Sequence, residues 1–158
     1  MILYSCPAML KSNKCSRRLR VMIVRNCAGG LVFAGDKVLL IRNDKHEWSF
    51  PKGVCKTGDR LVDVARSRVL IETGVDAEVI APCGKTSYEF YSATRGKPVH
   101  NNISWFVMKA PSEKCSPKES EGVLDAGFFT VEEAMENVTY SQDKSLLMVA
   151  FQKMREHG

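Results

Sequence analysis

The chain has 158 residues, a size that suits one domain with a full hydrophobic core. Its content of 44% apolar and 26% charged residues is typical of a globular protein, and no apolar run approaches the roughly 18 residues of a transmembrane helix. The net charge of +5 favours polyanionic ligands such as nucleotides, inositol phosphates or RNA.

Residues 1–18 contain no acidic side chain, and the first acidic residue of the chain is Asp36. We therefore expect a basic N-terminal extension at residues 1–18, followed by a single domain at residues 19–158. A mitochondrial transit peptide has a similar composition, but the apolar positions of this segment show no amphipathic period. The six cysteines lack zinc-type spacing, which indicates thiols in a reducing compartment, and we expect a cytoplasmic protein with no membrane partner.

Short apolar runs separated by turn residues predict strands before residue 50. The first two are expected at residues 19–24 and 28–33, the second opened by a Gly-Gly pair. A turn at residues 34–37 then leads to a strand at residues 38–41, so these segments form a hairpin. A charged loop and the sequence Trp-Ser-Phe-Pro-Lys follow, ending at Lys52.

The segment from Gly53 to Val75 reads as a glycine loop followed by one amphipathic helix. Asp59 is placed to accept hydrogen bonds as the N-cap, and Gly74 suits the left-handed position after the helix. On such a helix, positions 68, 71 and 72 share one face. Apolar residues recur at spacings of three and four, at Leu61, Val64, Ala65, Val69 and Ile71.

The second half of the chain predicts more strands and two helices. Strands are expected at residues 77–81, 86–91, 99–108 and 125–129. A turn at residues 92–97 and a polar surface loop at residues 110–123 separate them. Thr130 and Glu133 have the spacing of a capping box that begins a short helix, and Ser141 is expected to cap the last helix.

The segment after Lys52 resembles a Nudix box, the signature of the Nudix hydrolases. That pattern is a glycine, five residues, a glutamate, seven residues and then Arg-Glu-apolar-any-Glu-Glu-any-Gly-apolar. The chain retains Gly53, Glu72, Gly74 and Val75. It replaces the other chemical positions with Asp59, Ser67, Arg68 and Ile71. The resemblance runs from about residue 20 to residue 154, and it implies a Nudix α/β/α sandwich with a mixed β-sheet.

The substitutions remove most of the carboxylates that such a helix gathers. Hydrolysis of a phosphoanhydride needs a divalent metal to neutralise charge and orient water, and Mg²⁺ takes oxygen ligands. Carboxylates at positions 68, 71 and 72 would converge on one ion, but this chain offers Arg68, Ile71 and Glu72. Arg68 lies four residues before Glu72, so we expect the two to pair with the guanidinium in the space of the metal.

The resemblance also implies a role for particular residues. Metal ligands would be the carbonyl of Gly53 and the carboxylates of Glu72 and Asp59. Glu72 and the loop residue Glu121 would be the catalytic carboxylates, with Mg or Mn as cofactor if the protein is active and none otherwise. The residues expected to bind substrate are Lys52, Arg68, Tyr88 and Trp105. Each has a structural alternative: a surface lysine, a helix ion pair or core aromatics.

Three functions stay open at this stage. The first is a Nudix-fold protein that binds a nucleoside polyphosphate or a related diphosphate-linked ligand, with weak or no hydrolysis. The second is an active Mg- or Mn-dependent pyrophosphohydrolase of (di)nucleoside polyphosphates. The third is a non-catalytic scaffold that binds RNA or protein. The sequences SYEFY at residues 87–91 and VHNNISWFVM at residues 99–108 resemble the branch acting on diadenosine and diphosphoinositol polyphosphates.

Overall fold

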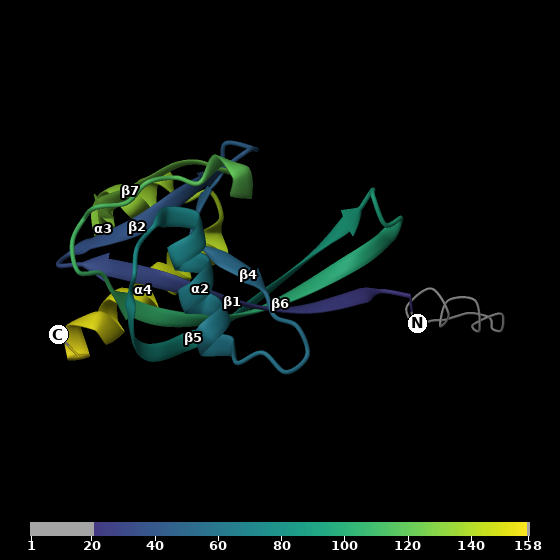
Figure 1. Cartoon of the computed structure of the whole chain (residues 1–158), viewed down its shortest axis with the longest axis horizontal. Helices are drawn as coiled ribbons and strands as arrows, with labels where there is room; N and C mark the ends of the chain where they lie inside the picture. The colour runs from purple at the N-terminus through teal and green to yellow at the C-terminus, as the bar shows by residue number, and fades with distance from the viewer. Residues whose placement is uncertain (1–20, 158) are drawn as a thin grey trace. The chain divides into compact units, whose positions relative to one another are not determined.

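The computed structural model describes residues 21–157 (Figure 1). The expected basic extension at residues 1–18 and the transit-peptide alternative therefore lie outside the described residues. The chain clusters into two compact units, one with the described residues 21–25 and 87–102, the other with residues 26–86 and 103–157. The expected single domain at residues 19–158 stays a prediction.

Within residues 21–157, seven strands form one sheet, in the order β3-β2-β1-β6-β5, with β4 paired to β1 and β7 paired to β2. Pairing of β1 with β2 and β4, and of β2 with β3 and β7, is antiparallel. The strands are β1 (Ile23–Ala34), β2 (Lys37–Asn43), β3 (Trp48–Ser49), β4 (Lys52–Val54), β5 (Glu78–Ser92), β6 (Lys97–Lys109) and β7 (Val123–Thr130).

Strands β1 and β6 run parallel, which makes the sheet mixed. Near the start of both strands, Arg25 donates a hydrogen bond to Asn101, and at their ends the amide of Ala110 donates to the carbonyl of Phe33. A parallel pair needs a long crossover, and the chain from β1 to β6 includes a helix and several strands. The mixed sheet predicted from the sequence is confirmed.

Helices cover both faces of the sheet in the larger unit. They are α2 (Leu61–Thr73), the one-turn 3₁₀ helix η1 (Glu119–Glu121), α3 (Val131–Asn137) and α4 (Ser141–His157). Figure 1 shows α2 in front of the sheet and α4 behind it. Alternation along β1 explains both layers, because Val32 packs with Ala65 and Val69 of α2, whereas Phe33 packs with Leu147 of α4. The predicted α/β/α sandwich is confirmed.

Two expected breaks between strands are wrong. The strands expected at residues 19–24 and 28–33 belong, from Ile23 onward, to the continuous strand β1. The strands expected at residues 77–81 and 86–91 are likewise the single strand β5, which bends at Gly84, where φ is +120°. Glycine permits that angle without loss of the ladder, so a residue typical of turns lies inside a strand.

In the smaller unit, β5 and β6 form a hairpin whose turn contains Gly96. Its φ is +62°, and its amide donates to the carbonyl of Ser92 at 2.7 Å. The predicted turn at residues 92–97 is confirmed. None of the described helices is long and apolar enough to cross a bilayer.

Candidate functional site

The loop between β4 and α2 begins beside β1 and leads into the helix that carries Arg68 and Glu72. Gly53 in β4 pairs with Ala28 of β1, which fixes the entry to the loop. The Oδ2 atom of Asp59 accepts the amide of Lys56 at 2.9 Å, so it closes a turn in the loop. The predicted N-cap role of Asp59 is wrong, because α2 begins at Leu61 and its N-cap position is Arg60. Asp59 lies one residue too early to reach the orphan amides.

The C-terminal end of α2 matches the sequence prediction. Gly74 has φ +75° and ψ +5°, and its amide donates to the carbonyl of Leu70 at 2.8 Å. This left-handed position favours glycine. The following loop is tied to the same end of the helix, since the amides of Ser116 and Lys118 donate to the carbonyls of Thr73 and Glu72. These bonds hold η1 next to α2 and so position Glu121.

One guanidinium links two carboxylates at the centre of the site. Arg68 Nη2 lies 2.6 Å from Oε2 of Glu72 and 2.9 Å from Oε1 of Glu121, and Arg68 Nε lies 3.0 Å from the same Glu72 oxygen. The predicted pairing of Arg68 with Glu72 is confirmed. Glu121 comes from 53 residues away along the chain, and its bond to Arg68 could not be predicted from helical spacing.

Burial and hydrogen bonding both shift the pKa values of Glu72 and Arg68. Glu72 is only 5% exposed, and burial raises its pKa above the usual value, although bonds from Arg68 and the charge of Lys52 act in the opposite direction. Burial lowers the pKa of Arg68, but its bonds to Glu72 and Glu121 outweigh this and raise that pKa overall. The guanidinium is therefore a permanent cation between two acids.

The side chains present do not fit a divalent metal. Mg²⁺ and Mn²⁺ need several oxygen ligands around one point, and no group of three acidic, histidine or cysteine side chains converges within residues 21–157. Glu72 and Glu121 converge, but their facing oxygens already accept bonds from Arg68. Asp59 is engaged in its own turn, and Ile71 has no ligand atom. We derive no metal-dependent step for this chain.

An open depression of about 540 Å³ lies along the exposed side of the loop and α2. Ser67 lines this surface at the position where the family pattern has an arginine. Both polar and apolar side chains line it. Its lining includes Val54, Asp59, Asp63, Ser67, Arg68 and Ile71.

The remaining residues expected to bind substrate lie in different surroundings. Lys52 is close enough to Glu72, Glu47 and Asp143 for its charge to lower the pKa of each. Trp105 is 2% exposed, packs edge-on against Phe50 and donates from Nε1 to Thr86.

Tyr88 belongs to the smaller unit.

Of the residues expected at the site, the structure brings together Lys52, Arg68, Glu72 and Glu121. Gly53 lies against the aliphatic stem of Arg68.

Asp143 is the acidic neighbour of Lys52 that sequence reasoning missed. It lies in the first turn of α4, where acidic residues are common for reasons of helix capping alone. No spacing relative to the box identifies it, because it is 91 residues from Lys52 along the chain.

A family model described as the NUDIX domain matches residues 23–149. The chain belongs to the Nudix family. A relative from Mycobacterium tuberculosis, named "Putative mutator protein MutT4", is 28% identical over 146 residues. This Nudix chain is covered to 85% in that alignment but spans only 57% of the relative's length.

Solved Nudix structures share the fold. A NUDIX hydrolase from Nitrosomonas europaea superposes with a TM-score of 0.65 at 19% identity, covering 85% of this chain and 73% of the other. An Ap4A hydrolase from C. elegans, solved as a binary complex, has a TM-score of 0.63 at 17% identity and covers 84% and 98% of the two chains. At these identities the likeness establishes the Nudix fold.

Proposed function

We propose that this Nudix protein binds a nucleoside polyphosphate or a related diphosphate-linked ligand and hydrolyses it weakly or not at all. The observation that carries the proposal is the position of Arg68, whose guanidinium bridges Glu72 and Glu121. A single organic cation there satisfies the two carboxylates that would otherwise gather a metal.

Two cations support the choice of ligand. Lys52 lies within electrostatic reach of Glu72, and Arg68 is half-buried beside the open depression. Guanidinium and ammonium groups bind phosphate oxygens through charge-assisted hydrogen bonds. The similar Ap4A hydrolase carries a dinucleoside polyphosphate in its name, which supports the same ligand class for this chain.

Weak turnover follows from the chemistry of the same cluster. Arg68 supplies positive charge but cannot lower the pKa of a bound water as a divalent ion does. It also has no vacant coordination position that could hold water and phosphate together. Binding is therefore retained in this proposal, and the step that activates water is lost.

Calorimetry with Ap4A and ATP tests the proposal, first in EDTA and then with Mn²⁺. We expect binding in EDTA that is weakened by Lys52→Gln and unchanged by Lys56→Gln, a matched change at the neighbouring loop. Product formation should stay near background with either Mg²⁺ or Mn²⁺. Absence of binding to both ligands, in every buffer, would refute the proposal.

The active pyrophosphohydrolase is the second candidate, favoured by the convergence of Glu72 and Glu121 on one point. If Mn²⁺ displaces Arg68, these two carboxylates face a common ion, with Asp59 and the Gly53 carbonyl as the other expected ligands. Rapid hydrolysis that Glu72→Gln abolishes would establish this candidate and overturn the first.

A further inference from the structure

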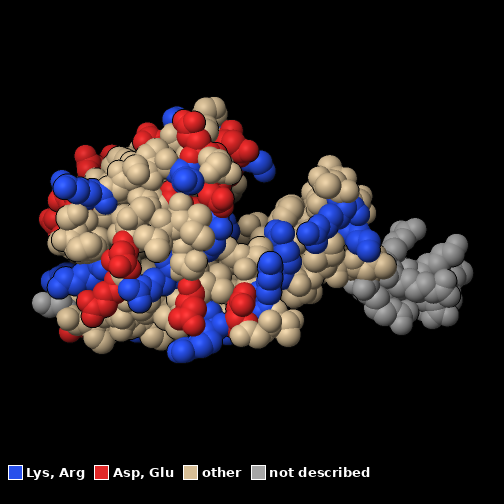
Figure 2. Space-filling view, viewed as in Figure 1, with Lys and Arg blue, Asp and Glu red and all other residues tan. Residues whose placement is uncertain are grey.

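Basic side chains outnumber acidic ones in the described part of the smaller unit. Residues 21–25 and 87–102 hold three basic residues, Arg25, Arg95 and Lys97, and one acidic residue, Glu89. They carry a net charge of +2, whereas residues 26–86 and 103–157, with 15 basic and 17 acidic residues, carry −2. Figure 2 shows basic side chains along the β5–β6 hairpin. A basic segment of this kind attracts polyanions.

Exposed aromatic rings lie on the described part of this unit. Tyr88 and Phe90, two residues apart on β5, are each 40% exposed, and their rings stack with centroids 5.9 Å apart and planes at 28°. The guanidinium carbon of Arg25 lies over the Phe90 ring, 5.6 Å from its centroid. Three planar groups therefore follow one another on a single face, which we call the Arg25–Phe90–Tyr88 row.

The buried side chain of Asn101 forms hydrogen bonds with two members of the row, Arg25 and Tyr88. It is 2% exposed, its Oδ1 accepts from Arg25 Nε at 2.9 Å, and its Nδ2 donates to the Tyr88 hydroxyl at 2.8 Å. One buried amide thus orients the guanidinium and one ring, so little side-chain entropy remains to be lost on binding.

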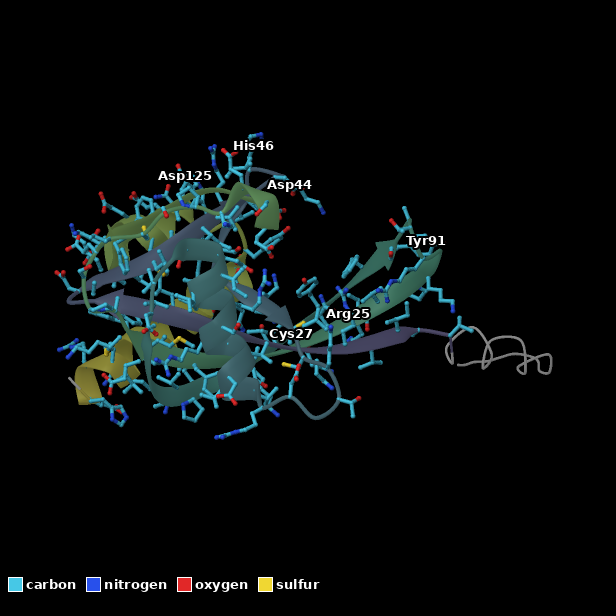
Figure 3. All side chains as sticks on the ribbon, in the orientation of Figure 1. Arg25, Cys27, Asp44, His46, Tyr91 and Asp125 are labelled. Carbon is cyan, nitrogen blue, oxygen red and sulfur yellow. The ribbon has the colours of Figure 1, made fainter. Side chains whose placement is uncertain are left out.

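The acidic residue of the unit lies on the other face. Strand alternation places Glu89 opposite Tyr88 and Phe90, and its carboxylate bonds to Nδ1 of His100 at 2.9 Å. Tyr91, 67% exposed, shares that second face and is labelled in Figure 3 together with Arg25. The carboxylate of Glu89 therefore lies on the face opposite the row, whose own charged group is the guanidinium of Arg25.

We propose that the Arg25–Phe90–Tyr88 row is a binding surface for single-stranded nucleic acid. Proteins that bind single strands combine a positive groove for the phosphates with aromatic side chains on which bases stack. The row supplies the stacking groups, and the net positive charge of residues 21–25 and 87–102, with Arg25, Arg95 and Lys97 against Glu89, supplies the attraction to phosphate. An apolar protein partner would not require this charge, so the observations favour nucleic acid. The row belongs to the smaller unit, whereas Arg68 and Glu72 belong to the larger unit.

Fluorescence anisotropy with the full chain and a labelled 12-nucleotide oligouridine tests this proposal. We expect measurable binding in 50 mM salt that weakens steeply as salt is raised, and much weaker binding to a 12-base-pair RNA duplex. Phe90→Leu should weaken binding about tenfold, in line with stacking energies measured for other proteins. Tyr91→Leu, the same type of change on the opposite face, should leave it unchanged.

Arg25 provides a second variant that does not remove an aromatic ring. Arg25→Gln should weaken binding and reduce its salt dependence, whereas Arg60→Gln, an equal loss of charge at an exposed site in the larger unit, should not. Circular dichroism and melting temperature check that each variant is folded. Equal effects of Phe90→Leu and Tyr91→Leu, duplex binding as tight as single-strand binding, or no binding at 100 μM protein would each overturn the proposal. Equal affinity for oligothymidine supports it, because stacking does not need the 2′-hydroxyl.

Discussion

Gly53 and Arg68 are in direct contact: a Cβ added to Gly53 would clash with Cγ of Arg68 and lie 2.5 Å from its Cδ. The aliphatic stem of the arginine thus occupies the space above a backbone that has no side chain. The absence of a side chain at Gly53 thus leaves room for the stem whose guanidinium bonds to Glu72 and Glu121.

Gly53→Ala is therefore expected to destabilise the protein by about 1–3 kcal/mol, the usual cost of overpacking, and to move Arg68 from its carboxylates. Urea unfolding measures this cost. In an Arg68→Ala background the same substitution should cost less than about 0.5 kcal/mol, because the clashing stem is gone. Equal costs in the two backgrounds would show that the contact does not restrict position 53.

Restoring the acidic face of α2 should create a metal site. In Arg68→Glu with Ile71→Glu, three carboxylates at positions 68, 71 and 72 share one face of the helix. We expect Mn²⁺ to raise the melting temperature of this variant but not of the wild-type protein, since an ion that binds only the folded state stabilises it. Turnover of Ap4A should rise at the same time.

The control for this gain is Arg66→Glu with Ile71→Glu, which adds the same charges but places one of them beside Asp76. Mn²⁺ should have no effect on that variant. If the restored helix shows no response to Mn²⁺, the loss of carboxylates is not what sets metal affinity here.

Thr86 and Trp105 give a prediction about the core. Trp105 is buried, and its Nε1 donates to Oγ1 of Thr86 at 2.8 Å. Thr86→Val keeps the shape but leaves a buried donor unsatisfied, so the free energy of unfolding should fall by about 1–3 kcal/mol. Thr86→Ser retains the acceptor and should cost less. Urea titration of both variants checks this, and equal losses would assign the effect to packing.

Sequence reasoning succeeded where the structure depends on neighbouring residues. The capping box of Thr130 and Glu133 and the left-handed Gly74 were both predicted, because each is specified by hydrogen bonds within four residues. The pairing of Arg68 with Glu72 was predicted for the same reason. These features follow from one turn of helix and require no tertiary information.

Sequence reasoning failed where a feature depends on contacts between residues that are far apart along the chain. The expected break between the strands at residues 19–24 and 28–33 is absent, because β1 is continuous through residues 25–27. The Gly29–Gly30 pair, expected to open the second strand, lies inside β1, where an added Cβ would meet Trp105 at 2.5 Å and Met108 at 2.8 Å. The contact of Glu121 with Arg68 depends on how the loop before β7 docks on α2. No local pattern contains that information.

Asp143 provides a prediction about pH. Burial raises the pKa of this half-buried carboxyl above its usual value of 3.8, although the charge of Lys52 partly opposes this. The folded protein therefore holds the proton more tightly than the unfolded chain does. The resulting stabilisation is complete below the unfolded pKa and is lost as the pH rises through the raised folded pKa. Asp143→Asn removes the titration, so the variant should gain stability relative to wild type as the pH rises from about 3.5 to 7.

Urea unfolding of both proteins at several pH values across that window measures the difference. Gln142→Asn, a change between uncharged residues at the neighbouring position, should give a difference from wild type that does not vary with pH. A constant difference for Asp143→Asn as well would mean that the ammonium group of Lys52 fully compensates the burial of the carboxylate. In that case Lys52 and Asp143 would form a stabilising pair, and Lys52→Gln should then destabilise the protein more at pH 7 than at pH 3.5.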